Sequence, residues 1–220
     1  MFNKFVKYLT MRKLFLYVLI AVSVSVSLSA QDRLDKPEMY LGVNLGVTES
    51  MVMFKPTVNQ GFLMGYNGGL VFRYIAEKNV GMQAELNFSQ RGWQESNGLY
   101  SRQLNYIELP FMTHIYIGNK NRVFFNLGPK ISYLLSEKTL VNKTANSTDS
   151  QHITDVQQPF DYSVCAGLGI LFNVNGRILQ LDTRANYGFS DIFHNTKSDT
   201  FSNSNSFNLS VNLAWLFQVR

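Results

Sequence analysis

Residues 80–91 read VGMQAELNFSQR, and the character of the side chains changes at almost every step. Successive side chains of a β-strand point to opposite faces, so this alternation indicates a strand with one apolar and one polar face. The apolar face carries Val80, Met82, Ala84, Leu86 and Phe88, and the polar face carries Gln83, Glu85, Asn87, Ser89 and Arg91. This segment predicts a long strand and makes an all-β fold the first hypothesis.

The same alternation recurs in other segments of the chain, both before and after this one. The expected strands lie at residues 40–48, 64–75, 105–117, 122–135, 160–173, 178–189 and 206–219. Short connections alternate with longer polar ones: the short ones are 76–79, 118–121 and 173–177, and the longer ones are 49–61, 92–102, 136–159 and 190–205. Outer-membrane barrels join their strands by short periplasmic turns and longer external loops. We therefore predict a transmembrane, antiparallel, up-and-down β-barrel of about eight strands.

Alternation alone also fits a soluble all-β protein, in which the apolar face would be buried. Three features favour the membrane barrel. The expected strands are long enough to cross the hydrocarbon when tilted, aromatic residues lie towards the ends of their apolar faces, and glycines recur on their polar faces. These glycines are Gly42, Gly46, Gly69, Gly128, Gly167 and Gly169. In a narrow lumen, glycine leaves room for long charged side chains, whereas on a solvated face it only weakens a strand.

The N-terminus has the order of a secretory signal: basic residues, an apolar run from Leu14 to Val26, and small residues ending at Ala30. We expect a signal peptide over residues 1–30, a short periplasmic segment over 31–38, and the outer-membrane barrel over 39–220. Met11 is an alternative start, and an uncleaved anchor is the alternative to cleavage. Cys165 is the single cysteine, so no disulfide can form within the chain.

The excess of positive charge belongs largely to the expected signal. The chain has 20 basic and 15 acidic residues, and the signal holds four of the basic ones, Lys4, Lys7, Arg12 and Lys13. The remaining chain is therefore almost neutral. Nucleic-acid binding would require a basic face, so we expect no nucleic-acid partner.

Charged residues on the polar faces of the strands predict a charge network inside the barrel. Its members are Arg73, Glu85, Arg91, Glu108, Lys130, Asp182 and Arg184. Counting residues about the 118–121 turn places Glu108 beside Lys130, and counting across the 92–102 loop brings Glu85 near Glu108. An ion network that fills a small barrel is the first interpretation, because eight strands enclose little more than their own side chains. A solute path is the alternative.

Catalytic and cofactor signatures are weak in this sequence. The three histidines are His114, expected in the lumen, and His152 and His194, expected in external loops. No Gly-x-Ser-x-Gly elbow and no His-x-x-x-His or Cys/His cluster occurs. We therefore expect no enzymatic activity, no cofactor and no metal.

Several segments resemble the PorT-like outer-membrane β-barrel family. They are residues 61–72, residues 83–92 (QAELNFSQRG), residues 106–111 (YIELPF), residues 167–169 and residues 187–192 (YGFSDI). The resemblance covers nearly all of residues 39–220 and implies an eight-stranded barrel in the outer membrane. It also implies a connection to protein secretion, which is associated with one branch of that family.

Our leading functional hypothesis is a non-enzymatic barrel with a structural or interaction role. Its expected partners are outer-membrane lipid and other envelope or secretion proteins, which it would meet through its loops. A narrow porin-like channel for small solutes is the first alternative, and an outer-membrane lipid-modifying enzyme is the second.

Overall fold

A computed structural model describes residues 33–55, 59–143, 152, 155–193 and 203–219. The expected signal peptide lies outside these residues. The described chain is built from strands, and none of its helical residues forms a segment that is long and apolar enough to cross a membrane. The strands are β1 (Arg33–Lys55), β2 (Gln60–Gly61), β3 (Leu63–Glu77), β4 (Val80–Glu95), β5 (Tyr100–Gly118), β6 (Asn121–Asn142), β7 (Phe160–Val174), β8 (Arg177–Asp191) and β9 (Asn203–Gln218).

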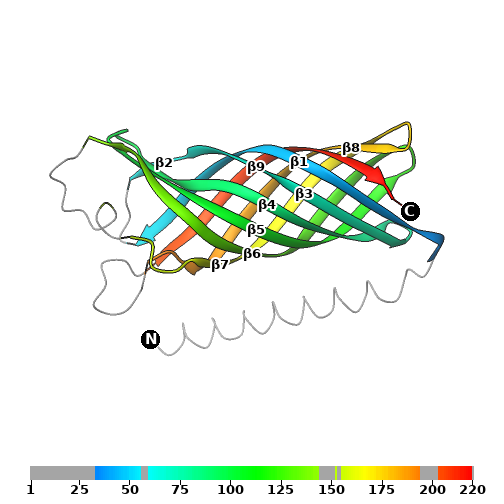
Figure 1. The fold of residues 1–220 in the computed structure, drawn as a ribbon, viewed down its shortest axis with the longest axis horizontal. Helices are drawn as coiled ribbons and strands as arrows, with labels where there is room; N and C mark the ends of the chain where they lie inside the picture. Colours follow the sequence, from blue (N-terminus) through cyan, green and yellow to red (C-terminus); the bar gives the residue numbers. More distant parts are fainter. Residues whose placement is uncertain (1–32, 56–58, 144–151, 153–154, 194–202, 220) are drawn as a thin grey trace, which may run out of the picture.

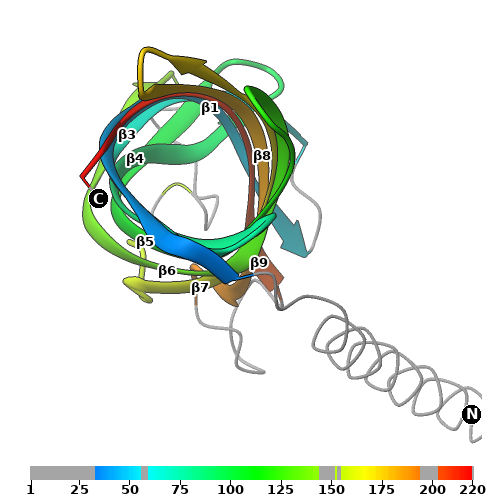
Figure 2. The same ribbon diagram turned by 90° about the vertical axis from the view of Figure 1, so that its right-hand side faces the viewer.

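The eight long strands form a closed antiparallel ring. Each strand pairs with its neighbours along the chain, and the β1–β9 ladder joins the two ends of the barrel. The two-residue strand β2 pairs with the far end of β4. The view along the axis shows the closed ring (Figure 2). The predicted all-β, up-and-down barrel is therefore confirmed, and closure leaves the wall of the barrel without an unpaired edge.

The two ends of the barrel differ in their connections (Figure 1). One end, which we call the turn end, carries the start of β1, the end of β9 and the three short turns. Asn175 and Gly176 both have positive φ values, 52° and 79°, as a two-residue hairpin turn requires. The other end, which we call the loop end, carries the longer connections.

The strands extend further than the hydrophobic pattern predicted. β1 continues to Lys55, β6 continues to Asn142, and only residues 96–99 separate β4 from β5, where we expected a loop over 92–102. β1 also begins at Arg33, within the segment expected to precede the barrel. Near the strand ends the apolar and polar alternation fades, while backbone pairing continues, so periodicity underestimates strand length there.

The faces of the sheet are inverted relative to those of a soluble protein. Large apolar side chains point outward and are exposed, as Leu45 (71%) and Ile117 (74%) illustrate. The polar side chains of Arg73, Gln83 and His114 point inward and are fully buried. An apolar exterior around a polar interior is the arrangement of a transmembrane barrel.

The lumen is divided into three layers along its axis. At the turn end lies an apolar cluster made by Tyr40, Val71, Ile75, Tyr116, Phe124, Leu171, Ile178, Ala214 and Leu216. At the loop end lies a second cluster made by Val52, Phe54, Trp93, Tyr100, Leu104, Tyr106, Ile192 and Phe193. Many of the buried charged and amide side chains lie between them, while Arg102 and Glu95 lie beside the loop-end cluster. Polar groups in this middle layer are therefore shielded from both openings of the barrel.

Candidate functional site

The structure places all seven residues of the expected charge network on the inner face, where each is buried. They come from five strands: Arg73 from β3, Glu85 and Arg91 from β4, Glu108 from β5, Lys130 from β6, and Asp182 and Arg184 from β8. They separate into two groups with different geometry.

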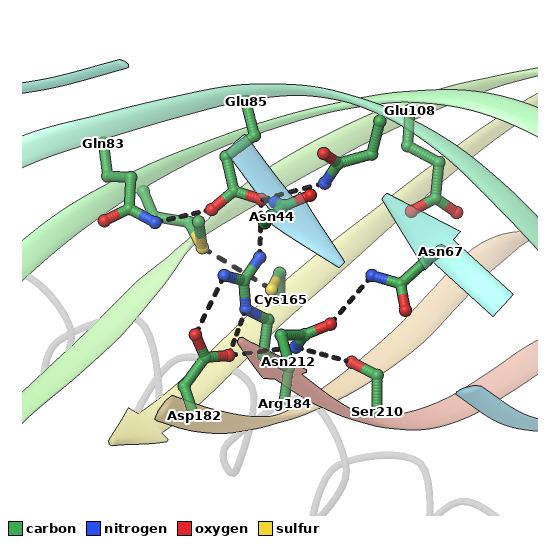
Figure 3. A network of polar contacts seen from close by, with 12 residues as sticks. Asn44, Asn67, Gln83, Glu85, Glu108, Cys165, Asp182, Arg184, Ser210 and Asn212 are labelled. Carbon is green, nitrogen blue, oxygen red and sulfur yellow. Dashed lines mark hydrogen bonds and ion pairs between the residues drawn. The ribbon is translucent and has the colours of Figure 1, made fainter. Parts of the chain in front are cut away.

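The first group connects opposite walls of the barrel (Figure 3). The Arg184 Nη1 atom lies 2.7 Å from Oε2 of Glu85, and its Nε atom lies 2.6 Å from Oδ1 of Asp182. β4 and β8 are four strands apart in either direction around the ring. The Arg184–Glu85 ion pair therefore spans the barrel rather than joining neighbouring strands.

Arg73 completes this group through two glutamines. Its Nη2 atom donates to Oε1 of Gln83 at 2.6 Å and also to Oε1 of Gln180. The Nε2 atom of Gln83 donates to Glu85, and that of Gln180 donates to Asp182, each at 2.5 Å. The result is a closed cycle of contacts, which we call the cross-barrel ring: Arg73, Gln83, Glu85, Arg184, Asp182 and Gln180. Two cations and two carboxylates balance within it.

Asparagine side chains on nearby strands donate further hydrogen bonds to these carboxylates. Asn44 and Asn87 donate to Oε2 of Glu85 at 2.9 and 2.8 Å, and Asn212 donates to Oδ1 of Asp182 at 2.9 Å. Gly167 on β7 is the direct cross-strand partner of Arg184. A Cβ atom at this position would lie 3.2 Å from Cγ of Arg184, so the glycine leaves space for the arginine stem.

The second group follows one arc of the wall, and we call it the arc cluster: Arg91, Glu108, Lys130 and Asp161. Lys130 Nζ lies 3.2 Å from both carboxylate oxygens of Glu108. The Nε atom of Arg91 lies 3.0 Å from Oε1 of Glu108, and its Nη1 atom lies 2.9 Å from Oδ2 of Asp161. The Arg91 guanidinium also packs on the Tyr106 ring, 3.9 Å from its centroid. These residues come from the consecutive strands β4, β5, β6 and β7.

The expected contact between Glu108 and Lys130 is present, but the two residues are offset by two positions in the ladder and are not direct cross-strand partners. Glu108 is opposite Ser132, and Lys130 is opposite Pro110, so the Lys130 side chain reaches Glu108 diagonally. Glu108 is paired with Asn87 across the β4–β5 ladder. Glu85 and Glu108 are therefore near neighbours in the ladder, but they bind different cations.

Sequence reasoning missed Asp161, Gln83 and Gln180 as members of these groups. Asp161 falls at the start of an expected strand, where the alternating pattern is short, but its neighbour Tyr162 faces outward and implies an inward Asp161. Gln83 lies on the expected polar face of its strand, and Gln180 shares the alternation of Asp182 and Arg184. Their link to Arg73 depends on which distant strands face each other, and one sequence does not contain that information.

The described histidines lie in different layers of the lumen. His114 is fully buried near the turn end, with its Nδ1 atom 2.7 Å from Oδ1 of Asn126. His152 lies at the loop end, with Nε2 2.6 Å from Oε1 of Glu95 and its ring stacked on Tyr100. His194 lies outside the described residues. Among the residues that are described, no three His, Cys, Asp or Glu side chains are placed to hold a metal ion.

Two small cavities lie beside the charged groups in the part of the chain that the structure describes. A cavity bounded by Glu108, Lys130 and Arg184 measures about 20 Å³, and another near Arg91 and Tyr106 measures about 10 Å³. One water molecule needs roughly 10–15 Å³ of such volume. Each of these cavities therefore holds about one water molecule and is too small for a solute.

Comparison with solved structures finds small bacterial outer-membrane barrels. Ail of Yersinia pestis shares 15% sequence identity over 82% of this chain and 99% of its own, with a TM-score of 0.43. OprG of Pseudomonas aeruginosa shares 10% identity over 82% of this chain and 95% of its own, with a TM-score of 0.45. The outer-membrane enzyme PagL shares 13% identity over 77% of this chain and 97% of its own, with a TM-score of 0.41.

These similarities concern general architecture and carry no information on activity. No curated protein matches the chain. A family model described as outer membrane protein beta-barrel domain matches residues 29–194, which is most of the barrel. The chain therefore belongs to the outer membrane protein beta-barrel domain family and is a protein of the Gram-negative outer membrane.

Proposed function

We propose that this protein is a closed, non-enzymatic barrel with a structural or interaction role, and that it meets its partners at the loop end. The observation that carries the proposal is the filled lumen. Apolar clusters occupy both ends, and two charge-balanced groups occupy the middle. An interior packed in this way supports the barrel wall and leaves the loops and rim as the surfaces for contact.

A channel for small solutes is less well supported by this interior. The cavities beside the charged groups measure only about 20 and 10 Å³. Conduction would require the Arg184–Glu85 ion pair to break, because that pair crosses the lumen. Breaking a buried ion pair leaves an unpaired buried charge, which typically costs about 3–5 kcal/mol.

The resemblance to PorT-like proteins, on residues 83–92 and 106–111 in particular, supports a connection to protein secretion or envelope assembly. In this proposal the barrel anchors or aligns other envelope proteins and does not itself carry the exported chain. A strain lacking this protein should then export less protein. Complementation with a variant shortened between β6 and β7, within residues 143–159, should fail to restore export.

Conductance in planar lipid bilayers tests the proposal directly. The purified, folded protein should give no discrete current steps. The Arg184→Ala and Glu85→Ala double variant serves as the comparison, because it removes the crossing pair. Regular current steps from the unaltered protein would establish a channel and contradict the proposal.

A further inference from the structure

At the loop end, β6 extends beyond its neighbour β7 (Figure 1). β5 pairs with β6 as far as Asn142, whereas the β7 ladder stops at Tyr133. One more backbone bond, in which the N–H of Leu134 donates to the carbonyl oxygen of Pro159 at 2.8 Å, ends the contact on that side. Residues 135–141, which we call the β6 edge, therefore have a ladder partner on one side only among the described residues.

The chain that leads into β7 turns away from the β6 edge and crosses the opening of the barrel. The N–H groups of Gln157 and Gln158 donate to the carbonyl oxygen of Ile192, at 3.2 and 3.3 Å. Val156 packs against the apolar cluster at the loop end, and its N–H donates to Oε2 of Glu137 at 3.3 Å. These residues therefore do not fill the place beside β6 that a longer β7 would take.

The opposite edge of the same sheet extension is covered by the chain itself. There, Gln60 and Gly61 of β2 pair with Glu95 and Gln94 at the end of β4. An uncovered strand edge is a template for pairing with another chain, so proteins usually cover or charge it. The contrast singles out the β6 edge, which no described strand covers.

The β6 edge is accessible from water and is already extended. Backbone groups without partners are not tolerated in hydrocarbon, so this edge lies outside the membrane core, in agreement with the exposed Lys138 and Thr139. β5 holds it from one side, and Arg102 Nη2 of β5 lies 2.7 Å from Oε2 of Glu137. A preformed edge loses little conformational freedom when another strand is added.

The charges on the β6 edge restrict its partner. Lys138 is exposed, and no ion pair joins it to another described residue. Glu137 faces inward and is paired with Arg102. Pairing of two β6 edges would bring like charges into one ladder, which disfavours a second copy of this chain. An acidic side chain beside Lys138 would be favoured instead.

Two β-bulges limit the length of the added strand. Relative to β5, β6 has one extra residue at Leu135 and another at Leu140, so the regular stretch is 136–139. Bulges increase the local twist and interrupt regular pairing. The two leucines are 54% and 44% exposed, and they offer apolar contacts at the two ends of this short stretch.

We propose that the β6 edge binds a short extended segment of a partner protein as an added strand, with an acidic side chain of that segment beside Lys138. The inference rests on the proposed function, since it names the way in which a partner is met at the loop end. Backbone hydrogen bonds to β6 provide the affinity, and the side chains select the segment.

Binding of short synthetic peptides to the folded protein in detergent tests the edge. One fluorescent peptide alternates threonine and valine around a central glutamate, and a second has lysine in place of the glutamate. Fluorescence anisotropy should show roughly two- to fivefold tighter binding of the glutamate peptide, the range for a cross-strand charge pair. A glutamate peptide that is N-methylated along its backbone cannot donate the hydrogen bonds of a strand and should not bind.

A matched pair of charge reversals separates the edge from the rest of the surface. Lys138→Glu should reverse the preference between the two charged peptides. Lys120→Glu makes the same change in a turn at the other end of the barrel and should leave the preference unchanged. The heat-dependent shift of each variant on an SDS gel shows that it is folded. Absence of binding, equal binding of the two peptides, or a preference that survives Lys138→Glu would overturn the proposal, as would binding of the N-methylated peptide.

Hydrogen exchange of the backbone amides locates the contact. Amides of the β6 edge that do not donate to β5 should exchange rapidly in the free protein and slowly with the glutamate peptide present. Slow exchange without peptide would show that another segment of the same chain covers the edge, and would overturn the proposal. If export depends on residues 143–159 but no peptide binds, the proposed function stands and this mode of contact is excluded. Regular current steps in bilayers would contradict the proposed function itself.

Discussion

The cross-barrel ring and the arc cluster contain the same charges but connect different parts of the wall. Each has two cations and two carboxylates, all buried in the same polar layer. The arc cluster runs along the consecutive strands β4 to β7: its two contacts with Glu108 join adjacent strands, and its Arg91–Asp161 pair joins strands three apart. The ring joins β4 to β8, which no ladder connects directly. Equal charge balance therefore has unequal consequences, because the Arg184–Glu85 pair joins strands at the greatest separation in the barrel, whereas most contacts of the arc cluster join adjacent strands.

The largest expected effect is from Arg184→Met, which removes the cation that joins the two walls. Glu85 and Asp182 would remain buried with Arg73 as the nearest cation, linked to them only through Gln83 and Gln180. Leaving buried charges without their partner costs about 3–5 kcal/mol. Urea unfolding in lipid vesicles should show a free energy of unfolding lower by that amount.

Lys120→Met is the control for this change, since Lys120 is an exposed residue in a turn. Its effect should stay within about 0.5 kcal/mol, as for most surface substitutions. If Arg184→Met lowers stability no more than Lys120→Met does, then the ring does not brace the barrel.

A smaller effect is expected from Lys130→Met in the arc cluster. Arg91 would still lie 3.0 Å from Glu108, so the carboxylate would keep one cation. The expected loss is about 1.5–3 kcal/mol, the usual contribution of a hydrogen bond to a charged group. Urea unfolding under the same conditions gives the comparison with Arg184→Met.

A double-mutant cycle with Glu108→Gln isolates the Lys130–Glu108 contact. Its coupling energy should be about 0.5–3 kcal/mol, as for residues in direct contact. A charge exchange between these two positions is unsuitable, because a lysine at 108 would face Arg91. A loss for Lys130→Met as large as that for Arg184→Met would remove the distinction between the two groups.

Much of the barrel could be predicted from the sequence because each strand is locally encoded. Alternation identifies the strands and their two faces, and strict alternation is required wherever one face meets lipid and the other meets the lumen. This is why all seven expected lumen charges are found on the inner face. Strand ends such as Glu95 and Tyr100 were misjudged, because pairing continues where the alternation fades.

Contacts across the lumen could not be predicted in the same way. Hairpin counting connects neighbouring strands, and it placed Glu108 beside Lys130, although the two are offset by two residues in the ladder. The Arg184–Glu85 pair depends on closure of the ring and on how the strands are staggered around it.

The apolar layers at the two ends also escaped prediction. At the loop end, residues such as Trp93 and Phe193 lie where the strands were expected to have ended. At the turn end, Val71 and Leu171 lie inside expected strands, on the face that was expected to be polar.

The smallest expected effect is from Gly167→Ala, which tests how tightly the ring occupies its space. The new Cβ atom would lie 3.2 Å from Cγ of Arg184, while its next neighbour, the carbonyl oxygen of Thr183, lies at an ordinary 3.4 Å. The arginine stem has to move slightly although its guanidinium is held by Glu85 and Asp182. We expect the free energy of unfolding to fall by about 1 kcal/mol, at the low end for overpacking.

The same substitution in the Arg184→Met background separates this cause from a general effect on β7, because the more flexible methionine can move aside. Unfolding measurements on the four proteins should therefore give non-additive losses, with Gly167→Ala almost neutral once Arg184 is absent. Additive losses would mean that Gly167 is required by the backbone of β7 and not by the space that the Arg184 side chain needs.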